Sequence, residues 1–213
     1  MATTRIDRAL VADTALRLLN EVGLDGLTLR AIAKELQVQA PALYWHFKNK
    51  QELLDEMATV MHRRMTHAAG GVPGLARGAT WQQLLVATNT ELRKMLLSYR
   101  DGAKVYGGAS FTGTDHAESL EAFLALMTAA GFPLRDAARA VMTAYAYTMG
   151  FVAEEQGMAP HPMDVPDRAN RLASYPLAAA AGPDLFTSYE ERFEEGLRVL
   201  IAGMETVYGP RSA

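Results

Sequence analysis

A short run of aromatic and basic side chains near residue 45 offers the clearest chemistry in this sequence. Tyr44, Trp45 and His46 follow one another, and Lys48 and Lys50 come directly after them. Phenol, imidazole and ammonium groups can all bind phosphate oxygens. Such a run on the outer face of a helix is unusual for core packing, so the pattern favours a DNA-binding surface. The alternative is a helical hairpin whose aromatic side chains pack on a neighbouring helix.

Two short helices joined by a turn would position this run. Thr28 can cap the first helix, because its hydroxyl can accept a hydrogen bond from an unpaired backbone amide. Residues 37–39 would form the turn, and the second helix would begin near Pro41, which suits a first helical turn. Leu43 and Phe47 are four residues apart and would form its buried side. This is the pattern of a helix-turn-helix, whose second helix enters the major groove of DNA.

The candidate DNA contacts are the side chains that this arrangement leaves on its outer surface. Arg30 could bind a guanine edge through two hydrogen bonds, and small alanines could contact thymine methyl groups. The full set is Thr28, Arg30, Gln39, Ala40, Pro41, Ala42, Tyr44, Trp45, His46, Lys48 and Lys50.

Neither a catalytic motif nor a metal-binding motif is present in the sequence. There is no cysteine, and the five histidines do not have the spacing of metal ligands. The glycine-rich stretch at 69–78 lacks the Gly-Lys-Ser/Thr ending of a phosphate-binding loop. We therefore expect no enzymatic activity, no cofactor and no metal. Two alternatives stay open: a helical interaction module without a small-molecule effector, and an uncharacterised all-α enzyme.

Length and charge are consistent with two functional parts. A chain of 213 residues, 49% of them hydrophobic, can form a small and a larger module that each have a core. The net charge of −3 divides into +2 over residues 1–50 and −5 over the remainder, although this tally alone leaves DNA binding undecided. No run of about 18 apolar residues and no signal peptide are found, so we expect a cytoplasmic protein without membrane association.

Two segments resemble a known family. The strings T-L-R-A-I-A-K-E-L and P-A-L-Y-W-H-F-K-N-K-Q-E-L-L-D are similar to the DNA-binding domain of the tetracycline-repressor (TetR) family, over residues 5–67. The resemblance implies an all-α fold with a three-helix helix-turn-helix domain at 1–48, a linking helix at 49–67, and an effector-binding and dimerisation domain at 68–213. It also implies a homodimeric repressor that binds a palindromic operator and is released by a small molecule. Polar base-reading residues of tetracycline repressors are replaced by Ala40 and Ala42, so we expect a different operator.

The second segment, Y-R-D-G-A-K-V-Y-G-G-A-S-F at 99–111, resembles the drug-pocket segment of tetracycline repressors. The resemblance implies a histidine that ligates the drug-bound magnesium, but Tyr106 stands at that position. A phenol is protonated at neutral pH and is a poor magnesium ligand. Glu154 matches an acidic residue that the family supplies from the partner subunit; it could equally be a solvated carboxylate.

We therefore predict an apolar or aromatic effector, and not magnesium-tetracycline. The aromatic and methionine side chains near this segment could line its cavity, although such side chains more often form a core or a dimer interface. The candidate ligand-binding residues are Thr66, Thr88, Leu92, Tyr106, Phe111, Met127, Met142, Tyr145 and Glu154.

Several further helices are predicted after residue 79. Their expected ranges are 81–98, 115–130, 133–156, 167–175 and 189–208, and residues 176–183 are expected to be irregular. Capping boxes, in which a side chain at each end of a four-residue stretch bonds the backbone of the other, are predicted at Asn49, Thr80 and Ser188. The resemblance implies that the helices at 133–156 and 189–208 form a four-helix dimer interface, where Gly196 and Gly203 would allow close approach.

Overall fold

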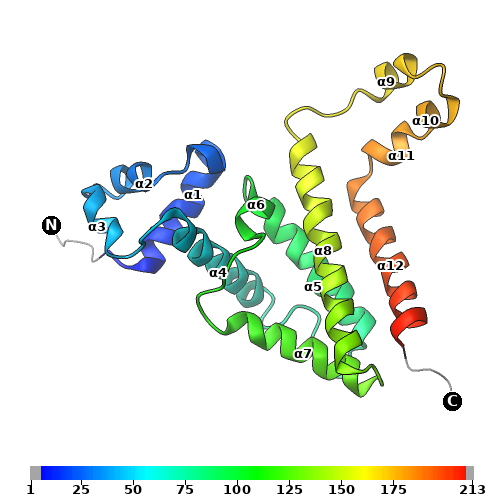
Figure 1. The fold of residues 1–213 in the computed structure, drawn as a ribbon, viewed down its shortest axis with the longest axis horizontal. Helices are drawn as coiled ribbons and strands as arrows, with labels where there is room; N and C mark the ends of the chain where they lie inside the picture. The colour runs from blue at the N-terminus through cyan, green and yellow to red at the C-terminus, as the bar shows by residue number, and fades with distance from the viewer. Residues whose placement is uncertain (1–5, 210–213) are drawn as a thin grey trace.

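The computed structural model describes residues 6–209, and within this range the chain is entirely helical, without β-strands (Figure 1). The predicted all-α class is confirmed. The helices are α1 (Arg8–Gly26), α2 (Leu29–Glu35), α3 (Ala40–Tyr44), α4 (Lys50–Ala68), α5 (Trp81–Leu97), α6 (Gly102–Tyr106), α7 (Asp115–Ala129), α8 (Leu134–Met158), α9 (Val165–Arg171), α10 (Pro176–Ala180), α11 (Gly182–Phe186) and α12 (Tyr189–Tyr208).

Helices α1, α2 and α3 form one end of the molecule, which we call the reading head (Figure 1). The hydroxyl of Thr28 accepts a hydrogen bond from the amide of Ala31, so the predicted cap of α2 is present. Leu43 and Phe47 are both fully buried. However, α3 ends at Tyr44, and the prediction that Trp45, His46 and Lys48 lie on this helix is wrong. The backbone amides of His46 and Phe47 donate to the Leu43 carbonyl. This turn buries Phe47 without a longer helix.

The long helix α4 connects the reading head to the rest of the chain (Figure 1). Asn49 caps it by accepting a hydrogen bond from the Glu52 amide, but the Glu52 carboxylate accepts from the Lys48 amide and not from Asn49. Only one half of the predicted capping box at Asn49 is therefore correct. A single buried core extends from α1 through α4 to α5 and α6, so α4 is packed along its length and can transmit a displacement.

A second core lies farther from the reading head. It joins the first half of α5 to α7, α8 and α12, and includes an edge-to-face contact between Trp81 and Phe132. The capping box at Thr80 is present in full, with Gln83 as its second member. Helices α8 and α12 pack against each other at the end of the molecule opposite the reading head (Figure 1).

The start of α12 differs from the prediction. Ser188 has left-handed backbone angles, with φ of 52°, and its side chain makes no cap hydrogen bond, so the predicted capping box is wrong. The physical reason is the backbone of Ser188 itself, because a capping residue adopts extended angles. A buried cation lies near this end of the helix. Arg93 on α5 is 5% exposed and pairs with Glu155 and Glu190. A buried guanidinium requires counter-charges, and the first turn of α12 supplies one of them.

The segment between α8 and α12 contains more helix than predicted. The intermediate helix spans Val165–Arg171 and not 167–175, because Asp164 caps it by accepting a hydrogen bond from the Asp167 amide. Residues 176–183, expected to be irregular, contain α10 and the beginning of α11. The three short helices arch beyond the ends of α8 and α12 (Figure 1). Among residues 6–209, none of the helices combines the length and apolarity needed to cross a bilayer.

Candidate DNA-binding surface and effector cavity

The outer surface of the reading head carries the aromatic and basic side chains singled out from the sequence. The side chain of Trp45 is 90% exposed and that of Tyr44 is 53% exposed, directly after the fully buried Leu43. Arg30 is exposed on α2, and Lys48 is exposed in the turn after α3. Large aromatic side chains are seldom left this open on a folded surface without a partner.

The first turn of α3 presents a second group of predicted contacts. Gln39 and Pro41 are exposed, whereas Ala40 and Ala42 are half-buried. Small side chains at a helix N-terminus leave room for another surface to approach the backbone. This end of α3 therefore has the shape that a recognition helix presents to a groove.

Three predicted DNA contacts also make contacts within the chain. The hydroxyl of Thr28 caps α2, the ammonium group of Lys50 donates to the Leu24 carbonyl at 2.9 Å, and the half-buried His46 accepts a hydrogen bond at its backbone oxygen. The side chains of Thr28 and Lys50 and the backbone of His46 are therefore held in place by the fold.

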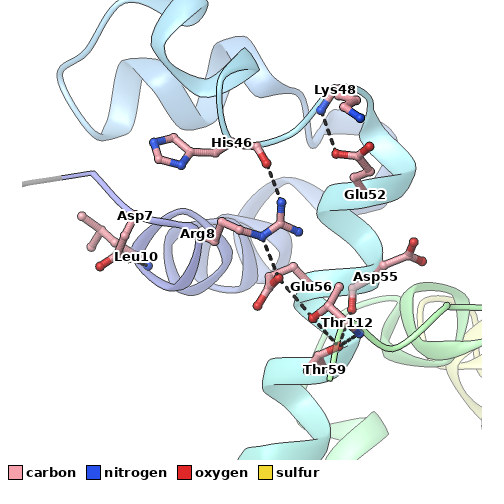
Figure 2. Close-up of polar contacts among 10 residues, drawn as sticks. All are labelled: Asp7, Arg8, Leu10, His46, Lys48, Glu52, Asp55, Glu56, Thr59 and Thr112. Carbon is pink, nitrogen blue, oxygen red and sulfur yellow. Dashed lines mark hydrogen bonds and ion pairs between the residues drawn. The ribbon is translucent and has the colours of Figure 1, made fainter. Parts of the chain in front are cut away.

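Arg8 supports the turn after α3 and was not singled out from the sequence. Its guanidinium lies 4.3 Å from the centre of the Phe47 ring, donates to the carbonyl of His46, and donates to the Glu56 carboxylate at 3.0 Å (Figure 2). It thereby connects α1, the turn after α3, and α4. The partners are 38 and 48 residues away in the sequence, so no local spacing could indicate them.

The same carboxylate connects the reading head to the loop between α6 and α7. The hydroxyl of Thr112 donates to Glu56 at 3.2 Å, and the Thr112 amide donates to the Thr59 hydroxyl at 2.9 Å (Figure 2). Phe111, the preceding residue, lines an internal cavity. A continuous series of polar contacts, the Arg8–Glu56–Thr112 relay, thus extends from the turn after α3 to the cavity wall.

The cavity has a volume of about 320 Å³ and lies between α4, α5, α6, α7 and α8. Its wall is mostly apolar, as is usual for sites that bind small organic molecules. Six of the predicted ligand-binding residues lie in this wall: Thr88, Leu92, Tyr106, Phe111, Met142 and Tyr145.

Three predicted ligand-binding residues lie elsewhere. Thr66 bonds to the carbonyls of its own helix and faces a surface groove beside Arg63, and Met127 is fully buried in the second core. Both belong to helices that line the cavity, but they lie on a different face of those helices. The spacing of residues in the sequence could not tell these faces apart. Glu154 is exposed on α8 and lies beside Tyr189 and Arg192, outside the cavity of its own chain.

Four polar residues of the cavity wall were missed in the sequence: His62, Asn89, His116 and Ser119. Nδ1 of His62 lies 3.1 Å from the Tyr106 hydroxyl. Burial lowers the pKa of His62, and repulsion from His116 lowers it further, so His62 is neutral near pH 7. Burial raises the pKa of the Tyr106 phenol above its ordinary value. The cavity is therefore uncharged at His62 and Tyr106.

The position of Tyr106 does not fit a magnesium ligand. Its hydroxyl stays protonated and already bonds to His62, and the residue is 5% exposed within a largely apolar wall. Within residues 6–209, no group of three or more acidic, histidine or cysteine side chains could hold a metal ion. The residues present thus do not favour a metal in this cavity.

A helix-turn-helix surface joined by one long helix to an internal apolar cavity defines a class of protein, the ligand-responsive DNA-binding regulators. Comparison with known proteins agrees with this assignment. Residues 11–57 match the family model of bacterial regulatory proteins of the tetR family, and residues 73–208 match the tetracyclin repressor-like C-terminal domain.

Individual relatives extend over nearly the whole chain. The tetracycline repressor protein class A from transposon 1721 of Escherichia coli is 37% identical over 226 residues, which cover 98% of each protein. A possible TetR family transcriptional regulator from Streptomyces coelicolor A3(2) has a crystal structure that is 36% identical, with a TM-score of 0.82, and covers 94% of this chain and 100% of that one. The structure of TetR(class A) in complex with 5a,6-anhydrotetracycline and magnesium is 34% identical, with a TM-score of 0.68, over 92% of this chain and 96% of that one.

This chain belongs to the TetR family of ligand-responsive transcriptional repressors. It is a DNA-binding regulator and not an enzyme. The family implies operator DNA and a small-molecule effector as its partners.

Proposed function

We propose that this protein is a cytoplasmic homodimeric repressor that binds a palindromic operator and leaves it when a small apolar or aromatic molecule occupies the cavity. In this proposal residues 1–48 form the DNA-binding domain and residues 49–67 form the linking helix. Residues 68–213 form the domain that binds the effector and dimerises. The observation that carries it is the course of α4. This helix begins with Lys50 beside the reading head and contributes His62 and Met65 to the cavity wall.

The Arg8–Glu56–Thr112 relay supports a route for release. A molecule that displaces Phe111 would also move Thr112, which bonds to Glu56 and Thr59 on α4. Glu56 in turn pairs with Arg8, which holds the His46 carbonyl in the reading head. Coupling requires only that the effector bind one arrangement of α4 more tightly than the other.

An open face of α12 supports the homodimer. Val199 and Val207 are 68% and 67% exposed, and between them Gly203 has open space around the position a side chain would take. These three residues are four apart and share one face of the helix. A second copy of α8 and α12 would cover this face and give two reading heads at a fixed spacing. The space beside Gly196 on the same helix is already occupied by the Tyr147 side chain of the same chain.

The cavity chemistry supports an effector other than magnesium-tetracycline. The relatives are tetracycline repressors by name, but Tyr106 stands where the family resemblance places a metal-ligating histidine. We expect calorimetric titration with tetracycline to give no tight binding, whether magnesium is present or chelated. Tight magnesium-dependent binding would contradict this part of the proposal.

The DNA-binding function is tested by selecting binders from a library of randomised DNA duplexes with the purified full-length protein. We expect a palindromic site, with an affinity that falls steeply as salt rises because phosphate contacts release counterions. Weak binding that is insensitive to salt, without an enriched sequence, would contradict the proposal.

The dimer is tested by sedimentation at micromolar protein. We expect a dimer, and we expect Val199→Glu to shift the protein toward monomer by burying a charge in the interface. The matched control is Glu194→Gln, because Glu194 is an exposed residue on the same helix that follows the buried Phe193. A wild-type protein that sediments only as a monomer would contradict the proposal.

A further inference from the structure

The cavity wall contains three buried polar atoms that have no hydrogen-bond partner among residues 6–209. They are Nε2 of His62, Nδ1 of His116 and Oγ of Ser119, and all three residues line the cavity. His62 is 6% exposed and Ser119 is 9% exposed. Buried polar groups are nearly always paired, because they lose hydration without replacement otherwise. Three such atoms in a mostly apolar wall indicate a place for the polar group of a ligand.

The three residues lie on the same part of the wall. The rings of His62 and His116 lie 5.6 Å and 5.0 Å from the Phe111 ring, measured between centroids, and His116 is stacked on it. Ser119 follows His116 by three residues on α7, hence on the same helix face. Helices α4 and α7 contact each other, so the polar atoms gather where these two helices meet.

Two other polar side chains of the wall, Thr88 and Asn89, are already hydrogen-bonded. The Thr88 hydroxyl donates to the Pro73 carbonyl at 2.9 Å. Asn89 donates to the Leu85 carbonyl and accepts from the Thr148 hydroxyl. These groups stabilise the wall itself. They leave the His62, His116 and Ser119 atoms, which we call the polar trio, as the part of the wall that a ligand can satisfy.

The hydrogen-bonding capacity of the polar trio narrows the ligand chemistry. Within the described part of the chain, the Tyr106 hydroxyl bonds only to His62 Nδ1. We assign the phenol as the donor, because its proton would otherwise be buried unpaired, and this assignment leaves the proton of neutral His62 on Nε2. The trio thus presents a donor at His62 beside groups that can accept. The lining contains no Lys, Arg, Asp or Glu, and a charged ligand would be buried without a counter-charge.

We propose that the cavity binds a neutral aromatic compound that carries a hydroxyl group. The hydroxyl accepts from His62 Nε2 and donates to His116 or Ser119, while the rings lie against the apolar remainder of the wall. This inference rests on the proposed function in one respect, namely that the bound compound is the effector.

The experiment is calorimetric titration of the full-length protein with three matched probes: 2-naphthol, 2-methoxynaphthalene and 2-naphthoate. We expect 2-naphthol to bind about tenfold more tightly than the ether, because the ether cannot donate and leaves an acceptor unpaired. We expect the naphthoate to bind more weakly than 2-naphthol, because its charge would be buried. Equal binding of alcohol and ether, tightest binding of the naphthoate, or no binding of any probe would overturn the proposal.

Substitutions test whether the preference for 2-naphthol over the ether depends on the polar trio. We expect Ser119→Ala or His116→Leu, whichever removes the group that accepts from the ligand hydroxyl, to weaken 2-naphthol binding several-fold and to leave binding of the ether nearly unchanged, which also shows that the cavity is folded. Thr88→Val is the matched control, since that hydroxyl is already bonded to Pro73, and the preference for the alcohol should survive it. A preference that survives both trio substitutions would overturn the proposal.

The same probes, added to the protein bound to its selected operator, separate this inference from the proposed function. Release by 2-naphthol and not by the ether supports both. Tight 2-naphthol binding without release supports the ligand class and contradicts its role as effector. Release by an apolar compound that shows no dependence on the polar trio supports the proposed function and overturns the ligand class.

Discussion

The reading head and the effector cavity use polar side chains in opposite ways. In the reading head, the functional groups are exposed on the surface, and residues 28–50 contain nearly all of them. In the cavity, the three unpaired polar atoms and the Tyr106 hydroxyl come from residues 62, 106, 116 and 119 on three different helices. An exposed surface on a short capped segment can be recognised locally. A buried site exists only after distant helices have packed, and its chemistry depends on which polar atoms that packing leaves unpaired.

The largest expected effect would come from removing the buried support of the reading head. Phe47→Ala deletes a fully buried ring beneath the Arg8 guanidinium, and such truncations cost about 3–5 kcal/mol. We expect operator binding to be lost while 2-naphthol still binds the cavity. Operator binding and calorimetry on the same sample measure the two responses. Equal loss of both functions would show that the two regions unfold as one unit and would break the comparison.

A smaller effect is expected at a single base contact. Arg30→Ala should cost about 1–3 kcal/mol of operator affinity and relax specificity at one position. Lys34, another exposed cation on α2, provides the control, since we assign it no base contact. Binding to a panel of operators with single changes measures the pattern. Equal losses on every operator would count against a base-reading role and leave Arg30 as a phosphate contact.

The relay between the two regions should affect coupling more than either binding event. Glu56→Gln weakens the pairing with Arg8 and Thr112, so we expect the change in operator affinity caused by an effector to shrink by about 0.5–2 kcal/mol.

The measurement is operator affinity with and without saturating effector, alongside effector affinity by calorimetry. Glu52→Gln is the control, because that carboxylate lies on the same helix and accepts from the Lys48 amide without contacting the loop. Coupling that is unchanged in Glu56→Gln would remove the relay from the mechanism.

The smallest effect on stability is expected at the most exposed aromatic residue. Trp45→Ala removes a side chain that is 90% exposed, and such surface substitutions usually change the free energy of unfolding by about 0.5 kcal/mol or less. We nevertheless expect weaker operator binding on all sequences. Denaturant unfolding and operator titration separate the two quantities. A large loss of stability would mean that Trp45 packs in the fold and not on DNA.

Local signals predicted much of the fold correctly. The Thr28 cap and the Thr80 capping box involve backbone groups only three residues away, so neighbouring residues suffice to specify them. The prediction at Ser188 was wrong because this residue has left-handed backbone angles, whereas a capping residue adopts extended ones. The predicted length of the recognition helix was wrong because Phe47 reaches the core through a turn. In that second failure a tertiary contact outweighed a local preference.

The sequence by itself determined the helical class, the helix-turn-helix and the exposed aromatic surface, since these follow from periodicity and capping within short segments. It also marked Tyr106 as a departure from a metal-binding pocket. Only the tertiary structure decided that Arg8, Glu56 and Thr112 connect the reading head to the cavity. It alone placed His62, His116 and Ser119 on one wall with unpaired polar atoms. The physical reason is that pairing and burial are properties of the packed chain. Whether these polar groups find a hydrogen-bond partner depends on residues that are distant in the sequence.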